Sequence, residues 1–247
     1  MKLALVADLH ANREATTAVM AHARAEGADR YAFLGDFVGY GADPAWTVDF
    51  VRRHVSQDAF AVLGNHDAAV VQGPLQSMTA DARAVIEWTR RRLDAEQTAF
   101  LAALPVSQTA HETLFVHANA WAPTEWAYIQ SRGDAMHSLL ATTSRFTVCG
   151  HVHVPMLYHL TGTGKAGDFA PTPGIAIPLS EQRRWLAIPG STGQPRDGNP
   201  AACYAMFDVA LHTLTFHRVP YDHAAAAAKI LAAGLPPTLA ERLTHGG

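Results

Sequence analysis

Polar side chains that bind metal ions follow five short apolar segments of the sequence, each with the pattern of a buried strand. The groups concerned are those of Asp8, His10, Asp36, Asn65, His117, His151 and His153. Imidazole nitrogen with carboxylate and amide oxygen, in the absence of a thiolate, is typical of sites for Mn, Fe, Zn, Ni or Co. These residue types therefore predict a centre for divalent or trivalent metal ions.

Two pairs of these residues, Asp8 with His10 and His151 with His153, are separated by one intervening position. In extended backbone such side chains point to the same side, so both members of a pair can reach one cluster. Asp36 has two carboxylate oxygens and can bridge two cations. Ligands of open α/β sheets bind where the carboxyl ends of strands meet, so residues far apart in the sequence can converge there.

Short apolar segments alternate with longer periodic ones over the first two hundred residues, which is typical of an α/β fold. We predict strands before the candidate ligands at 2–7, 31–34, 59–63, 113–116 and 146–149. Helices are predicted at 13–26, 44–54, 79–92, 95–103 and 133–142, with Asn12 and Asp43 as caps and a capping box between Asp94 and Gln97. Further strands are predicted at 155–161, 184–188, 202–209 and 213–219, the last two as a hairpin, before a helical tail that is broken at 234–237.

Each candidate ligand taken alone has a structural explanation. Asp8 can cap a helix, Asn65 can form a turn, and His117 can be a core histidine with satisfied hydrogen bonds. Seven such residues at the ends of five strands are hard to explain in that way, so the combination favours a shared site.

Five motifs resemble, in their order and spacing, the sequence blocks of the calcineurin-like metallophosphoesterases: Asp8-Leu9-His10, Gly35-Asp36, Gly64-Asn65-His66-Asp67, His117 and Gly150-His151-Val152-His153. The resemblance covers about residues 1 to 210. Segments 39–44, 189–198 and 234–236 are similar to a compact prokaryotic branch of phosphoesterases.

The resemblance implies a four-layer α/β/β/α sandwich, in which two mixed sheets are flanked by helices. It implies one metal ion held by Asp8, His10, Asp36 and His153, and a second held by Asp36, Asn65, His117 and His151. His66 is similar to the catalytic histidine of the family, which binds no metal and faces the scissile phosphate. Asp67 would then orient His66 by accepting its second ring N–H.

The function implied is hydrolysis of phosphomonoesters or phosphodiesters of small molecules. Two cations lower the pKa of a shared water and bind the phosphoryl oxygens, while His66 would act as general acid or stabilise charge. One alternative is a non-catalytic scaffold of the same fold, as in a retromer subunit, but every position is filled here, including His66. A second is a protein phosphatase, although Phe37-Val38-Gly39 stands where that branch has Asp-Arg-Gly.

Two further segments bear on the substrate. Arg196 lies in a Gly/Pro-rich loop that the fold would bring near the cluster, and we predict that it binds substrate phosphate. Trp121, Trp126 and Tyr128 follow His117 closely. They fit either an aromatic wall for a nucleobase or aryl leaving group, or ordinary packing of that loop.

Length and composition fit an α/β domain at 1–221 with a helical tail at 222–247 packed on it, because 49% of the 247 residues are hydrophobic. The net charge of −3 gives no reason to expect a nucleic-acid polymer or an anionic membrane as partner. A small-molecule phosphoester is the expected partner.

No segment has the roughly 20 apolar residues of a membrane span, and the apolar run before Asp8 is too short for a signal peptide. With only two cysteines, we expect a cytoplasmic location.

Overall fold

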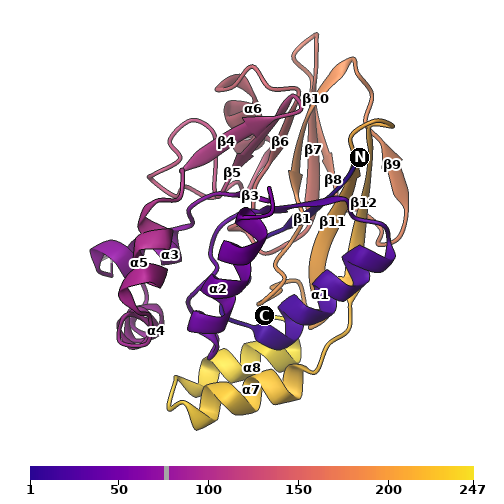
Figure 1. The fold of residues 1–247 in the computed structure, drawn as a ribbon. Helices are drawn as coiled ribbons and strands as arrows, with labels where there is room; N and C mark the ends of the chain where they lie inside the picture. Colours follow the sequence, from indigo (N-terminus) through magenta and orange to yellow (C-terminus); the bar gives the residue numbers. More distant parts are fainter. Residues whose placement is uncertain (75–77) are drawn as a thin grey trace.

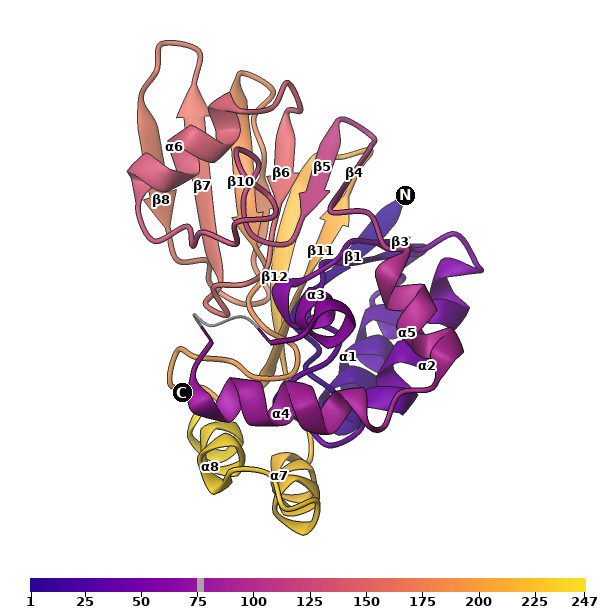
Figure 2. The same ribbon diagram turned by 90° about the vertical axis from the view of Figure 1, so that its left-hand side faces the viewer.

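Two six-stranded mixed sheets pack face to face, and helices cover both outer faces. The computed structural model describes residues 1–74 and 78–247 (Figure 1). Viewed along the sheets, α6 lies on one outer side and α1 and α2 lie on the other (Figure 2). This is the predicted four-layer α/β/β/α sandwich.

The first sheet contains three parallel strands that end at candidate ligands. Its order is β3 (Phe60–Ala61), β2 (Arg30–Phe33), β1 (Lys2–Val6), β11 (Ala202–Asp208), β12 (Thr213–Val219) and β9 (Ala176–Pro178). Strands β1, β2 and β3 are parallel, whereas β11 is antiparallel to β1 and forms the predicted hairpin with β12.

The second sheet supplies the other two strand ends. Its order is β4 (Ser107–Ala110), β5 (Thr113–Val116), β6 (Phe146–Val148), β10 (Arg183–Ile188), β7 (Met156–Thr161) and β8 (Ala166–Phe169). Strands β5, β6 and β10 are parallel. Parallel neighbours end on the same side of a sheet, so the loops after β5 and β6 leave from one edge.

Strand β1 is buried on both faces, as its continuous apolar run predicts. Leu3 and Leu5 belong to the core between the two sheets, whereas Ala4 and Val6 pack under the helices. This alternation follows from the period of two in a strand. The inter-sheet core also contains the stacked rings of Phe60 and Phe115, whose centroids are 5.1 Å apart.

The helices of the outer layers are α1 (Arg13–Ala25), α2 (Pro44–Val55), α3 (Asn65–Gln72), α4 (Ala80–Arg90), α5 (Ala95–Ala102) and α6 (Arg132–Leu140). The predicted capping box is confirmed, because Asp94 accepts from Gln97 N–H at 2.8 Å and Gln97 accepts from Asp94 N–H at 3.1 Å. Asn12 caps α1 as predicted. Asp43 occupies the predicted N-cap position of α2, but its side chain makes no cap bond and accepts from Lys229 instead.

The tail forms two helices, α7 (His223–Ala232) and α8 (Pro237–His245), which lie beside α4 and α1 (Figure 1, yellow). Ile230, Leu239 and Leu243 form a buried cluster with Val85 and Trp88 of α4. Within residues 1–74 and 78–247, no helix is long and apolar enough to span a membrane.

Four elements were not predicted. Strand β9 is an edge strand of the first sheet, and β4 and β8 are the two edge strands of the second. Their sequences lack the apolar run of a central strand. Helix α3 begins inside the Gly64-Asn65-His66-Asp67 motif, where Gly and Asn indicate a turn.

Candidate metal centre

All seven predicted ligands lie together at the edge where the parallel strands of both sheets end. Their side chains come from the segments after β1, β2, β3, β5 and β6. Six of them are almost completely buried and Asn65 is partly buried. Three groups of ligand atoms, each within 4.8 Å of one another, are formed by Asp8, His10 and His153, by His10, Asp36 and His66, and by Asp36, His117 and His151.

In one half of the centre, the Nε2 atoms of His10 and His153 are only 3.1 Å apart. The Nδ1 atoms of the same rings lie 3.1 Å from the Val38 carbonyl oxygen and 2.6 Å from that of Gln194. A carbonyl oxygen only accepts, so Nδ1 carries the proton and Nε2 presents a lone pair in each neutral ring. Two lone pairs therefore face each other without a proton between them.

The other half repeats this arrangement. His117 Nε2 lies 3.1 Å from His151 Nδ1 and 3.0 Å from the side-chain oxygen of Asn65. The far nitrogens of the two rings lie 2.7 Å from the Leu34 carbonyl oxygen and 2.9 Å from that of Trp126. Such contacts to the backbone fix the ring orientation of metal-binding histidines.

Asp36 lies between the two halves. Its Oδ2 is 3.4 Å from His117 Nε2 and 3.8 Å from His10 Nε2, while its Oδ1 accepts from the backbone N–H of His66 at 2.8 Å. One oxygen thus faces both halves and the other is held by the backbone. Asp8 accepts from the backbone N–H of His151 with both oxygens, each at 3.1 Å.

Burial dominates the electrostatics of the centre. Burial raises the pKa of Asp8 to about 7 and lowers the pKa of His151 to about 3. Burial also tends to lower the pKa of His117, but the nearby Asp36 carboxylate raises it to about 9. In the metal-free protein, a proton on His117 supplies charge that a cation would supply. Converging ring nitrogens and hard oxygen donors fit a site for divalent ions.

The backbone at five of these residues has the left-handed conformation that favours glycine. The φ angles are 54° at Asp8, 45° at His10, 54° at Asp36, 67° at His151 and 66° at His153. Such conformations persist only where the surrounding structure imposes them, and they concentrate at functional sites.

His66 and Asp67 differ from the prediction. Asp67 does not accept the ring N–H of His66, because its oxygens accept backbone N–H groups of Phe37, Val38 and Gly64 at 2.9, 3.2 and 3.1 Å. It thereby ties the loop after β2 to the start of α3. His66 Nδ1 is buried without a hydrogen-bond partner and faces Gly39, where an added Cβ would lie 2.3 Å from it.

Arg196 lies close enough to the centre to lower the pKa values of His10, His66 and His153. Its guanidinium donates to the side-chain oxygen of Gln194 at 3.1 Å and lies 5.6 Å from the ring centroid of Tyr40. Among the described residues it has no ion-pair partner.

The three aromatic residues after β5 have different surroundings. Trp121 stacks on His137 of α6 at 4.6 Å and belongs to packing. Tyr128 stacks on the candidate ligand His151 at 4.0 Å, with 45% of the residue exposed. Trp126 contacts His117 edge to face at 5.9 Å.

Sequence reasoning missed the acceptors of the four histidines and one aromatic neighbour. The acceptors are backbone carbonyls of Leu34, Val38, Trp126 and Gln194. A backbone carbonyl has no signature in residue type, so no signal could have identified them. Tyr40, whose ring lies 4.5 Å from both the His10 and the His66 ring, could have been noticed from its place between Gly39 and Gly41.

Known proteins support the same interpretation. A family model described as the calcineurin-like phosphoesterase superfamily domain matches residues 1–211. An uncharacterised protein of Methanocaldococcus jannaschii is 32% identical over 99% of this chain and 98% of its own length. The crystal structure of a metallophosphoesterase from Sphaerobacter thermophilus has a TM-score of 0.88, is 34% identical and covers 100% of this chain and 99% of its own. A hypothetical protein from Pyrococcus horikoshii shares the fold, with a TM-score of 0.78 at 17% identity over 100% and 98% of the two chains. The chain belongs to the calcineurin-like phosphoesterase superfamily and is a metallophosphoesterase, a hydrolase of ester bonds.

Proposed function

We propose that this protein hydrolyses phosphomonoesters or phosphodiesters of small molecules at a centre for two metal ions. The supporting observation is the pair of short contacts between ring nitrogens, His10 with His153 and His117 with His151, both 3.1 Å. In each pair the near ring nitrogens converge on a point that a cation can occupy, and in the metal-free protein the proton on His117 takes that place in the second pair. Two such contacts support two ions.

One ion would be held by Asp8, His10, Asp36 and His153, and the other by Asp36, Asn65, His117 and His151. When bound, the two ions supply Lewis acidity that activates water and neutralises phosphoryl charge. Asp36 would contribute to both through the oxygen that faces His10 and His117.

Two further residues, His66 and Arg196, would contact the substrate, and Asp67 would position His66. His66 lines the cleft beside the centre and packs its Nδ1 against Gly39, which leaves Nε2 as the ring nitrogen for a phosphoryl or leaving oxygen. Asp67 holds the α3 start that presents His66, and so acts as a positioning residue. Arg196, which has a guanidinium without an acidic partner among the described residues, would bind a phosphoryl oxygen.

Metal analysis combined with a phosphoester panel tests the proposal. Chelator-treated protein should be inactive, and reloading with Mn, Zn, Fe, Ni or Co should restore two ions per chain and turnover of bis-p-nitrophenyl phosphate or p-nitrophenyl phosphate. Full activity of the metal-free protein would exclude the mechanism. Two bound ions without turnover of any panel member would favour the scaffold alternative, and turnover of phosphopeptides alone would favour a protein phosphatase.

A further inference from the structure

A cleft with a volume of about 360 Å³ opens beside the metal centre. His66, Asn65 and His151 form its wall on the side of the centre, and Tyr128, Trp126 and Glu125 line it from the loop after β5. Its volume lies within the range of roughly 300–1,000 Å³ that small-molecule ligands occupy. A phosphoester bound at the ions would therefore extend its leaving group into this cleft.

Tyr128 provides a fixed aromatic surface in the cleft. Its ring is nearly parallel to that of His151, at 17° and 4.0 Å between centroids, while 45% of the residue stays exposed. A lone exposed tyrosine needs no explanation, but this one packs on a candidate metal ligand, and the part of its ring that His151 does not cover is free to stack. Met78, just before α4, and Ala82, within α4, also line the cleft, so a planar group bound there would contact apolar side chains as well.

The charges along the cleft differ from those at the centre. Of the described residues that line it, Glu125 is the one with a formal charge at neutral pH, and it is exposed. Arg196 is not among the described lining residues; it lies beside the centre, near His10 and His153, and 5.6 Å from the ring centroid of the lining residue Tyr40. The Arg196 guanidinium is thus available to the phosphoryl group. A second phosphate on the leaving group would lie near the Glu125 carboxylate, and the described lining residues include no lysine or arginine to neutralise it.

We propose that the cleft selects esters whose leaving group is a planar aromatic group without further phosphates, such as a nucleoside. Tyr128 determines the preference by stacking, and Glu125 disfavours leaving groups with additional phosphates. This inference rests on the proposed hydrolysis at the same centre.

Adenosine 5′-monophosphate and ribose 5-phosphate test the stacking, because both release a primary alcohol and differ only in the base. Both are also measured as methyl diesters, with release of adenosine or ribose followed by chromatography, so that a mono- or diesterase preference does not matter. We expect kcat/KM to be about tenfold higher for the adenosine compound, the size of effect that base–aromatic stacking produces. Tyr128→Leu should remove most of this ratio and Tyr128→Phe should retain it. An equal kcat/KM for both compounds in the parent would overturn the inference.

Adenosine 3′,5′-bisphosphate tests the charge, with release of the 5′-phosphate followed by chromatography. The parent should hydrolyse it with a kcat/KM about tenfold below that of the monophosphate, and Glu125→Gln should narrow this gap several-fold. Glu181→Gln is the matched control, because Glu181 lies outside the cleft and should leave the ratio unchanged. If the ratio of kcat/KM between monophosphate and bisphosphate is the same in Glu125→Gln as in the parent, the proposed effect of Glu125 is contradicted.

Calorimetry with metal-free protein separates this inference from the proposed function. Adenosine should bind at least tenfold more tightly than ribose, and Tyr128→Leu should abolish the difference. If the metal-loaded protein hydrolyses no ester, the proposed function fails, whatever the affinity for adenosine. If esters are hydrolysed and adenosine binds no better than ribose, the inference fails and the proposed function stands.

Discussion

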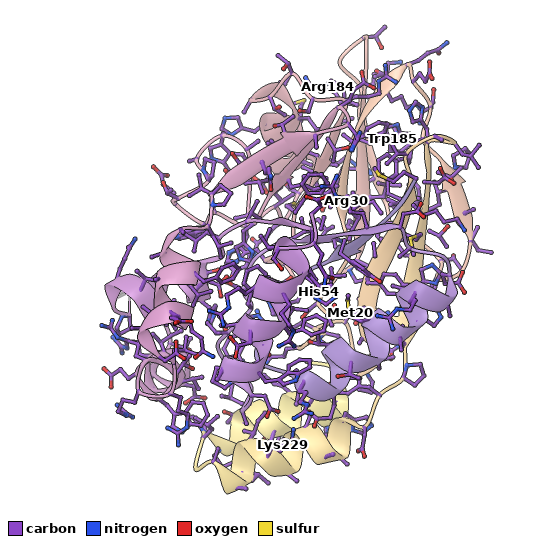
Figure 3. The ribbon with its side chains drawn as sticks, viewed as in Figure 1. Met20, Arg30, His54, Arg184, Trp185 and Lys229 are labelled. Carbon is purple, nitrogen blue, oxygen red and sulfur yellow. The ribbon has the colours of Figure 1, made fainter. Side chains whose placement is uncertain are left out.

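Lys229 of α7, which is labelled in Figure 3, donates to Asp43 directly before α2, with 2.7 Å between Nζ and Oδ2. The same ammonium lies 2.5 Å from Glu14 Oε1 in α1. Residue 43 ends the loop that contains Tyr40, and Tyr40 also contacts the apolar cluster of α4, α7 and α8. The tail is thereby connected to a loop that touches His10.

Replacement of Lys229 by Met should lower the free energy of unfolding by about 1 kcal/mol, because two partly buried carboxylates lose their cation. Urea titration measures this, and the effect should shrink in high salt. Lys165→Met is the control, since Lys165 is an exposed turn residue with no ion pair among the described residues. Equal stability of the two variants would contradict a structural role for the Lys229 cluster.

His153→Ala should abolish binding at one of the two ion sites. The ring supplies a lone pair 3.1 Å from His10 Nε2, and its removal leaves Asp8 without its nearest histidine partner. Elemental analysis after dialysis should give about one tightly bound ion per chain instead of two. His212→Ala, which removes a histidine paired with Glu181, should retain both. Retention of two tightly bound ions in His153→Ala would refute this ligand assignment.

His66→Ala should retain both ions and lose turnover by roughly 10²–10⁴-fold, the usual contribution of a proton donor or acceptor. The metal content and the rate on bis-p-nitrophenyl phosphate are measured on the same sample. A parental rate would show that His66 takes no part in the reaction.

Gly39→Ala should reduce turnover much more than Gly164→Ala does. Both glycines have positive φ, +88° and +80°, so both substitutions incur a backbone cost of roughly 1–2 kcal/mol. An added Cβ meets His66 Nδ1 at 2.3 Å only at residue 39, whereas nothing lies within 4 Å at residue 164. The alanine must therefore displace the His66 ring. Equal activity of the two variants would contradict the importance of this contact.

His217 should make the protein less stable in acid. Burial, and then the neighbouring His22, lower the pKa of His217, whose ring stacks on Tyr204 at 4.8 Å. The unfolded chain, with a pKa near 6.5 at this residue, binds the proton more tightly than the folded protein does. Its stabilising contribution is therefore complete above about pH 6.5 and is lost progressively as the pH falls from there to the lower pKa of the folded protein. Between pH 8 and 5 the parent should lose more unfolding free energy in urea than His217→Phe, and parallel losses would contradict this.

The sequence predicted the strands that end at the centre because each combines two strong signals. Strands β1 and β2 are apolar runs that end at Val6 and Phe33, and residues capable of binding metal follow within three positions. The edge strands were not predicted because strands such as Ser107–Ala110 have no apolar face to recognise. Pairing with a neighbour defines them, and pairing is a property of the folded chain.

The convergence of the seven side chains followed from residue types and strand order, but their mutual orientation did not. Asp67 illustrates the difference. An acidic residue next to His66 suggested a side-chain pair, yet the backbone N–H groups of Phe37, Val38 and Gly64 are nearer. Hydrogen bonds to main-chain groups depend on the path of distant segments, which a single sequence does not encode as a local pattern.

The left-handed backbone at Asp8, His10, Asp36, His151 and His153 has an evolutionary consequence. Glycine at any of these positions would relieve strain of roughly 1–3 kcal/mol and would at the same time remove a ligand. Relief of backbone strain alone would favour glycine at these positions, whereas metal binding requires the side chains that are present. The strain at these five positions is therefore accounted for by the ligands that the backbone presents, and not by the stability of the fold.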